Sequence, residues 1–306
     1  MPADPASPAA ATPADAVSPR FGARPGGLAR NRISASAEIV AVAGPGGVTR
    51  LPVLSSQVPL VLRRTPDAVY VVGGAAGPIG GDELDLRISV RAGAFLRVRT
   101  AAAAIALPGP DGLESVLRVT VDLEAGARLE YLPEPVVVSA GARHATIFRV
   151  TLTAGASLLL RDELLLGRHG EAGGAARSVL RVDYAGRPLL RQSLEVSGAD
   201  PVSRGPAVLA GHRAAGTLLH VDPAMDAGPA TDAGPAVTSG LRAVGSQHLV
   251  GDTMQVPADI PIYADTTVAV MPLAGPGVLV TALANDAVTL RQQLSVHGSP
   301  GPDPSA

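Results

Sequence analysis

Between residues 86 and 189, the chain repeats one pattern of apolar and polar positions four times. In each copy, apolar residues alternate with polar ones, as at Leu86, Ile88 and Val90, and a short turn containing Ala-Gly follows. A second, shorter alternating stretch comes after the turn. The turn glycines are Gly93, Gly126, Gly155 and Gly186, at separations of 33, 29 and 31 residues. Alternation with a period of two on both sides of a glycine turn is typical of a β-hairpin with one buried face.

A single unit of this kind cannot bury its apolar face alone, whereas stacked neighbours create a continuous core. The repeats therefore predict a mainly β fold of stacked, solenoid-like β-sheets built from hairpin units. Four independent hairpins in an ordinary β-sandwich are the alternative, and the sequence leaves one solenoid and two-sheet packing both open. Glycine suits the turns because it adopts positive φ without a Cβ clash. The glycines to which we assign structural turn roles are Gly80, Gly81, Gly93, Gly126 and Gly155.

Other segments add strands before the repeats and one helix after them. Residues 33–41 alternate and predict an early strand, and the apolar run 69–72 predicts another. Near the C-terminus, apolar residues at helical spacing over 287–294 predict a short helix, with Asn285 or Asp286 as its N-cap.

Composition shifts divide the chain into segments. The N-terminal stretch is rich in Ala, Pro, Ser and Asp and lacks the charged and apolar regions of a signal peptide. The expected organisation is a disordered tail (1–23), a β-repeat core (24–220), a flexible Ala/Gly/Pro insertion (221–240), a C-terminal part of the same domain with one helix (241–298) and a second disordered tail (299–306).

Composition also excludes several kinds of chemistry. All 25 basic residues are arginine, so no lysine can form a Schiff base or complete a P-loop. The absence of cysteine excludes disulfides, thiolate nucleophiles and Cys-ligated metal sites, and it fits a cytoplasmic protein. The net charge of −2 gives no basic footprint for nucleic acid, and the apolar runs are shorter than the ~20 residues of a membrane-spanning helix. We therefore expect neither nucleic acid nor a membrane as a partner.

Motifs for catalysis are missing. The Gly-rich loop 73–81 ends in Asp82, where a P-loop would need Lys and Ser or Thr, so the loop is better explained by Asp82 accepting backbone N–H bonds. Carboxylates cluster at 82–85 and at Asp162-Glu163, but the six histidines form no metal-binding motif, and no nucleophile elbow occurs. The sequence predicts that the protein is not an enzyme.

Five segments spread over residues 24–220 match a known set of motifs in order. They are the loop ending in Gly80-Gly81-Asp82, the turn 90–94 (VRAGA), the segment 124–134 (EAGARLEYLPE), the segment 161–168 (RDELLLGR) and the segment 211–219 (GHRAAGTLL). In this order they resemble the UreD (also called UreH) family of urease accessory proteins. Three features depart from the family's pattern: Asp162 stands where Trp is usual, Ala140 stands where many members have Asp, and the segment 101–105 (AAAAI) replaces one that contains Lys and Tyr.

The resemblance implies a metallochaperone scaffold that is required for nickel insertion into apo-urease. It implies a complex with the accessory protein UreF and the GTPase UreG, and no permanently bound cofactor or metal, with Ni²⁺ only in transit along an internal polar route. Carried over to this chain, the candidate nickel-route carboxylates are Asp82, Glu163 and Glu134. Spaced carboxylates in a wet channel bind a hydrated divalent cation weakly enough to release it.

A second hypothesis is a non-catalytic β-solenoid binding module for a carbohydrate or protein ligand. Carbohydrate binding would call for exposed aromatic side chains along a groove. The chain has three Phe, four Tyr and no Trp, which disfavours this hypothesis.

Overall fold

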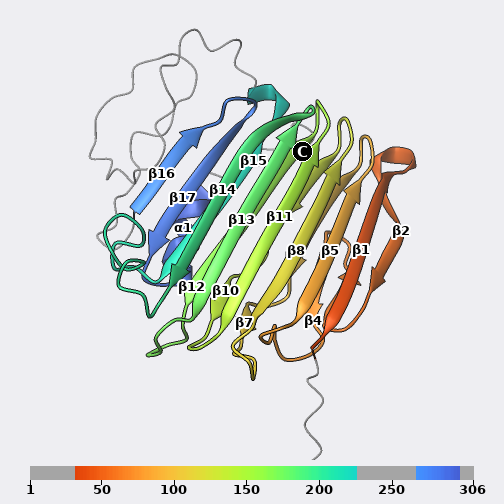
Figure 1. Cartoon of the computed structure of the whole chain (residues 1–306). Helices are drawn as coiled ribbons and strands as arrows, with labels where there is room; N and C mark the ends of the chain where they lie inside the picture. Colours follow the sequence, from red (N-terminus) through yellow and green to blue (C-terminus); the bar gives the residue numbers. More distant parts are fainter. Residues whose placement is uncertain (1–31, 226–266, 297–306) are drawn as a thin grey trace, which may run out of the picture. The chain divides into compact units, whose positions relative to one another are not determined.

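The computed structural model of the protein describes residues 32–225 and 267–296. The predicted tails 1–23 and 299–306, and most of the predicted insertion 221–240, lie outside these residues. The described strands form two sheets, and an α-helix follows the last strand (Figure 1). The predicted class, a mainly β fold of stacked sheets with a minor C-terminal helical part, is confirmed.

The two sheets, called A and B below, contain seven and ten strands of the described chain. In spatial order, sheet A consists of β14 (Arg187–Ser197), β13 (Ala175–Tyr184), β11 (Arg143–Leu152), β8 (Glu114–Leu123), β5 (Glu83–Val90), β1 (Ser34–Ala43) and β2 (Thr49–Ser56). Sheet B consists of β16 (Thr267–Pro272), β17 (Gly277–Ala284), β15 (Ala214–Val221), β12 (Ser157–Leu166), β9 (Arg128–Tyr131), β6 (Phe95–Thr100), β4 (Val69–Gly73) and β3 (Leu60–Arg64). The short strands β10 (Val136–Val138) and β7 (Ala104–Ala106) extend sheet B beside β12. Two single 3₁₀ turns lie at Pro45–Gly47 and Pro223–Met225.

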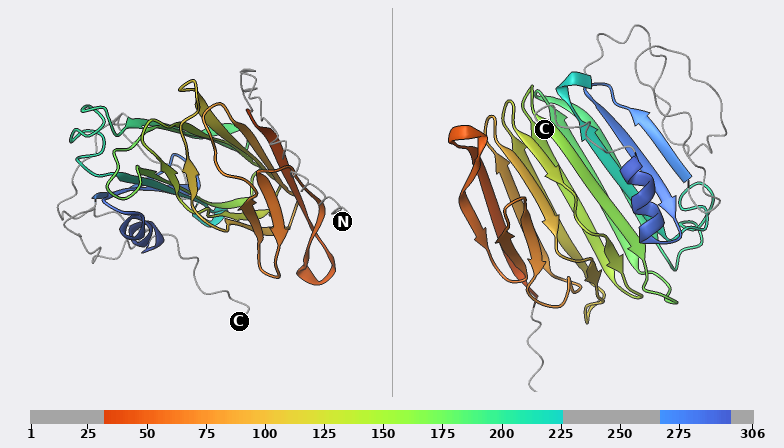
Figure 2. Two further views of the ribbon diagram at one scale, coloured as in Figure 1. Left: turned by 90° about the horizontal axis from the view of Figure 1, so that it is seen from below. Right: turned by 180° about the vertical axis from the view of Figure 1, so that it is seen from behind.

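The repeated units connect the two sheets. In the first three units, the strand before the turn glycine lies in sheet A and the strand after it lies in sheet B. Equivalent strands pair in parallel: β5, β8, β11 and β13 in sheet A, and β6, β9 and β12 in sheet B. The two layers face each other in Figure 2. The units are therefore stacked arches, not hairpins whose two strands bond to each other, and the solenoid and the two-sheet packing are one and the same arrangement.

The fourth unit is a true hairpin, because β13 and β14 pair antiparallel within sheet A. At its turn, both Ala185 (φ 49°) and Gly186 (φ 76°) have positive φ, as a type I′ turn requires. Each of the first three turns has one positive φ, at a glycine: Gly93 (69°), Gly126 (69°) and Gly155 (85°). Neighbouring arch turns also bond to one another, since the Gly126 N–H donates to the Gly155 carbonyl at 3.2 Å. The fourth unit thus ends the parallel stack of sheet A.

The main core lies between the two sheets and is built from the inward positions of the alternating strands. Ile39, Ile88, Val121 and similar residues are fully buried there. Phe148 of β11 packs edge-on against Tyr131 of β9, with ring centroids 6.1 Å apart. Burial of a side chain of this size stabilises the fold by roughly 2–3 kcal/mol, so the alternation, more than any polar contact, holds the arches together.

The helix α1 (Ala287–Val296) covers the outer face of sheet B, where Leu290 and Leu294 pack against β15 and β17 (Figure 2). Of the two predicted N-cap candidates, Asn285 and Asp286, it is Asp286 that caps the helix, because its Oδ1 accepts the Thr289 N–H at 2.8 Å. The close approach requires Gly216 on β15: a Cβ there would lie 2.7 Å from Leu294 Cδ1. No helix within residues 32–225 and 267–296 is long and apolar enough to span a membrane.

Candidate functional site

The ladder on one side of β12 is interrupted in the middle of the strand, while the ladder with β15 on the other side is continuous. Residues 157–160 of β12 pair in parallel with β9, and residues 164–166 pair in parallel with β10. The three residues between them, 161–163, face the segment 132–135, which makes no ladder with β12. Pro133 and Pro135 lie in that segment, and proline has no N–H to donate to a ladder. The two prolines therefore explain the interruption, which is called the β12 gap below.

The three residues at the β12 gap are all charged, and alternation along the strand directs them to opposite sides. Arg161 and Glu163 face the side covered by α1, together with Leu159 of the same strand. Asp162 faces sheet A, where it meets Ser178 of β13. Adjacent carboxylates thus lie on the two faces of one strand, at the point where that strand lacks a ladder on its β9 and β10 side and pairs only with β15.

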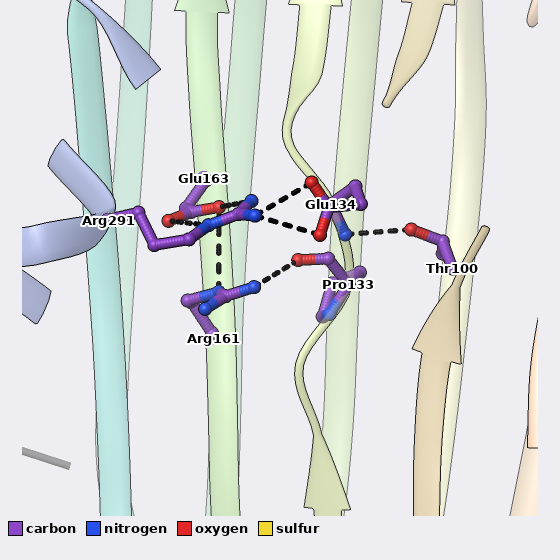
Figure 3. Close-up of polar contacts among 6 residues, drawn as sticks. All are labelled: Thr100, Pro133, Glu134, Arg161, Glu163 and Arg291. Atoms are coloured by element: carbon purple, nitrogen blue, oxygen red, sulfur yellow. Dashed lines mark hydrogen bonds and ion pairs between the residues drawn. The ribbon is translucent and has the colours of Figure 1, made fainter. Parts of the chain in front are cut away.

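On the α1 side, two arginines and two glutamates form a closed cluster (Figure 3). Arg291 of α1 lies between the carboxylates: its Nη2 is 2.6 Å from Glu163 Oε2, and its Nη1 is 2.7 and 2.8 Å from the two oxygens of Glu134. Arg161 donates to the Pro133 carbonyl at 2.9 Å, and its Nε lies 3.5 Å from Glu163 Oε2. The Glu134 N–H donates to Thr100 Oγ1 at 2.7 Å. Towards β12, the segment opposite the gap is thereby held by side chains instead of a ladder.

Burial within this cluster is uneven. The Glu163 side chain is fully buried, whereas Arg291 is 30% exposed and Glu134 is 35% exposed. The hydrogen bond with Glu163 is the main reason that the pKa of Arg291 is raised, and burial lowers the pKa of Arg161, which still remains charged as arginines do. Two positive and two negative charges cancel, so both carboxylates are already neutralised by arginine. A cation arriving here would have to displace the Arg291 guanidinium.

On the sheet A side, Asp162 belongs to a small polar layer within the apolar core. Asp162 Oδ2 accepts a 2.5 Å hydrogen bond from Ser178 Oγ. Nearby, His144 of β11 contacts Ser115 Oγ through Nδ1 at 2.9 Å and Thr146 Oγ1 through Nε2 at 3.3 Å. A cavity of about 10 Å³ lies between Asp162, His144, Thr146 and Ser178. This volume is about what one water molecule needs.

The low polarity between the sheets shifts both titratable groups towards their neutral forms. Burial raises the pKa of Asp162 to about 6 and lowers the pKa of His144 to about 4. Burial likewise raises the pKa of Tyr131, with the charge of Asp162 as a second cause. Near neutral pH, His144 is therefore uncharged, while Asp162 titrates just below neutral pH.

The structure brings together two of the three carboxylates that the sequence suggested. Glu163 and Glu134 share Arg291, but Asp82 lies elsewhere, in the loop before β5. Asp82 is 2% exposed and accepts two backbone N–H bonds, from Ile33 at 3.0 Å and Ile79 at 2.9 Å. These bonds fix the Gly-rich loop to the start of β1, which is the structural role expected for that aspartate.

Gly80 and Gly81, at the end of the same loop, each require glycine for a different structural reason. Gly81 has a φ of 97°, which residues with a Cβ rarely adopt. A Cβ on Gly80 would lie 2.5 Å from the Leu113 carbonyl oxygen and 2.6 Å from the Gly109 nitrogen. The loop is therefore closed by backbone packing, and it leaves no room for a phosphate group at Gly80.

Several residues of the site were not predicted. Arg291, His144 and Ser178 lie outside the matched motifs. Arg161 begins the matched segment 161–168, but the sequence assigned it no role. Two prolines within a stretch that otherwise alternates could have indicated the β12 gap. Among the described residues, no three His, Asp or Glu side chains are grouped so that they could hold a metal ion.

The fold and the site together define a class: a β-arch protein with a charged segment, residues 161–163, in the middle of an interior strand of one sheet. Comparison with known sequences gives the family. Residues 34–297 match the model of the family described as UreD urease accessory protein. The chain is 40% identical to the urease accessory protein UreD of Frankia alni, over 94% of this chain and 99% of that protein, and 44% identical to UreD 3 of Streptomyces griseus, over 80% and 88%. The chain belongs to the UreD family of urease accessory proteins.

Proposed function

We propose that this protein is a non-catalytic scaffold for nickel insertion into apo-urease, acting in the cytoplasm in a complex with UreF and UreG. Family membership supports a role in urease maturation. The partners, the cargo and the location come from the resemblance and the composition of the chain. GTP hydrolysis belongs in this proposal to UreG, because this chain has no phosphate-binding loop and no lysine.

The observation that carries the proposal is the charged β12 gap. Glu163 lies on the α1 side of sheet B and Asp162 lies on the side of sheet A, so carboxylates are available on both faces of one strand. A divalent cation passing this point would exchange part of its hydration shell for carboxylate oxygens. Neutral His144 and the water-sized cavity add an imidazole ligand suited to Ni²⁺ beside Asp162.

In this proposal, Arg291 keeps the nickel route closed until a partner acts on the protein. With its guanidinium between Glu163 and Glu134, both carboxylates are occupied and the cluster is neutral. Entry of a dication requires Arg291 to leave, because an arginine and a metal ion compete for the same oxygens. Because Arg291 belongs to α1, a partner that moves α1 would expose the carboxylates.

The test is nickel loading of urease after co-expression of the urease subunits with the other accessory proteins. Without this chain, we expect folded urease that lacks nickel and activity. Formation of active, nickel-replete urease in its absence would overturn the proposed function. In the presence of the chain, Glu163→Gln and Asp162→Asn should each lower the nickel content of urease, with Glu38→Gln, an exposed carboxylate on β1, as the matched control. If both variants load nickel as well as the control does, the route through the β12 gap is wrong while the scaffold role stands.

The carbohydrate-binding hypothesis gains nothing from the structure. Within residues 32–225 and 267–296, the aromatic side chains are buried or half-buried. Phe95, at the start of β6, is covered by the guanidinium groups of Arg97 and Arg128, 4.7 and 5.2 Å from its ring centroid. The described part of the chain therefore offers no open aromatic platform for stacking on a sugar ring.

A further inference from the structure

The outer face of sheet A carries arginines in register across neighbouring strands. The parallel and antiparallel ladders place Arg149 of β11 beside Arg181 of β13, and Arg181 beside Arg191 of β14. On the other side, Arg149 neighbours Thr120 of β8, which in turn neighbours Arg87 of β5. All four arginines are exposed. We call Arg87, Arg149, Arg181 and Arg191 the arginine row.

The stability of the fold does not account for the placement of arginines beside one another in this row. Adjacent strands lie about 4.8 Å apart, and like charges directly opposite each other on a sheet destabilise it. Arg191 is paired with Asp183. Among the described residues, Arg87, Arg149 and Arg181 have no carboxylate partner, whereas Arg177 and Arg118 on the same face do. Repulsion between Arg149 and Arg181 thus remains without internal compensation.

The surface around the row is hollowed. An open depression of about 790 Å³ lies over β11, β13 and β14, and Arg149, Arg177, Arg181 and Arg191 line it. The strand positions just before the row hold half-buried aliphatic residues, Ile147 beside Val179. Guanidinium groups around an aliphatic floor are a combination enriched at protein–protein contacts, where arginine binds carboxylates in a bidentate way.

The carboxylates on the same face favour an acidic protein segment over a nucleic acid as the anionic partner. Exposed or half-exposed carboxylates, Asp122 and Asp183, lie on the ladder row directly after the arginines. A continuous phosphate backbone lying across the face would meet them, whereas separate carboxylates on a protein segment can face the arginines and avoid the aspartates. The net charge of −2 also gives no general attraction for nucleic acid.

We propose that the arginine row and the Ile147–Val179 floor form a docking surface for an acidic segment of a partner protein, one in which carboxylates alternate with aliphatic residues. The guanidinium groups of Arg149 and Arg181 bind the carboxylates, and the aliphatic side chains of the segment cover Ile147 and Val179. The surface lies on sheet A, whereas the Arg291 cluster lies under α1 on sheet B. The inference does not depend on nickel transfer.

The test uses the full-length chain and a fluorescein-labelled peptide of repeated Glu-Glu-Leu, with a Gln-Gln-Leu peptide and a single-stranded DNA of equal charge as comparison probes. We expect the acidic peptide to bind, and to lose affinity when sodium chloride rises from about 0.1 M to about 1 M, which shortens the Debye length from about 10 to about 3 Å. Arg149→Glu/Arg181→Glu should bind it at least about tenfold more weakly. Arg50→Glu/Arg64→Glu, which reverses two exposed arginines on β2 and β3, should bind as the wild type does.

Four outcomes would overturn the inference. They are failure of the acidic peptide to bind the wild type, equal losses in the two double variants, tighter binding of DNA than of the acidic peptide, and equal binding of the Gln-Gln-Leu peptide. Because all four substituted arginines are exposed, the variants should fold, and circular dichroism checks that they do. The neutral variant Arg149→Gln/Arg181→Gln should give an intermediate loss, which separates a missing attraction from an added repulsion.

Discussion

Replacing Asp162 with asparagine removes a carboxylate from between the sheets and preserves its shape. The hydrogen bond donated by Ser178 can remain, because the asparagine side chain also offers an oxygen. Burial raises the pKa of Asp162 from 3.8 to about 6. A shift of about 2 units corresponds to roughly 3 kcal/mol between the two protonation states. The wild type bears this cost whenever Asp162 is ionised.

The direction of the pH effect follows from proton counting. Between pH 3.8 and about 6, the folded chain keeps the Asp162 proton and the unfolded chain has lost it. A rise in pH therefore destabilises the fold across this window, and the stability present below pH 3.8 is lost as the pH passes about 6. At pH 8 we expect Asp162→Asn to be more stable than the wild type by up to about 3 kcal/mol, with the difference vanishing towards pH 4.

The titration of His144 makes the free energy of unfolding change with pH in the opposite direction. Burial lowers its pKa from 6.5 to about 4, so acidification through this window protonates the unfolded chain first and destabilises the fold. In the wild type, the effects of Asp162 and His144 on the pH dependence of the free energy of unfolding oppose each other between about pH 4 and 6. In Asp162→Asn only the effect of His144 remains, so the stability of the variant should fall more steeply on acidification.

The assay is urea unfolding of the full-length chain, followed by far-ultraviolet circular dichroism at several pH values from about 4 to 8. Asp122→Asn, at an exposed position on β8, controls for loss of a negative charge. The reasoning is refuted if the difference between Asp162→Asn and wild type does not change with pH, or if the variant is the less stable protein at pH 8.

Three further predictions concern the free energy of unfolding, measured in the same way. Arg291→Ala should cost about 3 kcal/mol because it leaves the fully buried Glu163 with only the longer, 3.5 Å ion pair to Arg161. Glu134→Ala should cost under about 1 kcal/mol, and equal losses would contradict the burial argument. Asp82→Ala should cost about 1–3 kcal/mol, since two buried backbone N–H groups lose their acceptor, and an unchanged midpoint would show that water replaces it. Gly126→Ala should cost about 1–2 kcal/mol because φ there is 69°. Its control is Gly73→Ala, at an exposed position without positive φ. A smaller loss of stability at Gly126 than at Gly73 would reject this account.

The strands could be predicted from the sequence because alternation reports which side chains are buried. It does not report which strand lies beside which. Residues flanking Gly126 alternate in the same way whether the two strands bond to each other or face each other across a core. The turn conformations decide between the two, and the arch turns differ from the fourth turn by one additional positive φ, at Ala185. That difference is backbone geometry, which the Ala-Gly pairs common to all four copies do not reveal.

The site was predictable only in its local part. Glu163 and Glu134 lie in segments with recognisable motifs, but Arg291 is 128 and 157 residues away from them in the sequence. Nothing near Arg291 indicates that a helix returns to the middle of sheet B. The raised pKa of Asp162 likewise depends on burial between the sheets, which outweighs the lowering by the Ser178 hydrogen bond, so it exists only after the two layers have packed.

The distance along the chain between Arg291 and its partners has a consequence for how the protein is made. Each parallel arch pairs with the one before it, so a chain emerging from the ribosome can add arches in order. The segment that carries α1 is synthesised after the described strands, so until then Glu163 stays in contact with water and β12 keeps one uncovered face. A nascent chain therefore passes through a stage with an open, charged patch on sheet B, and the last turns of the helix convert that patch into a closed interior. Truncation just before α1 would leave the protein at that stage permanently.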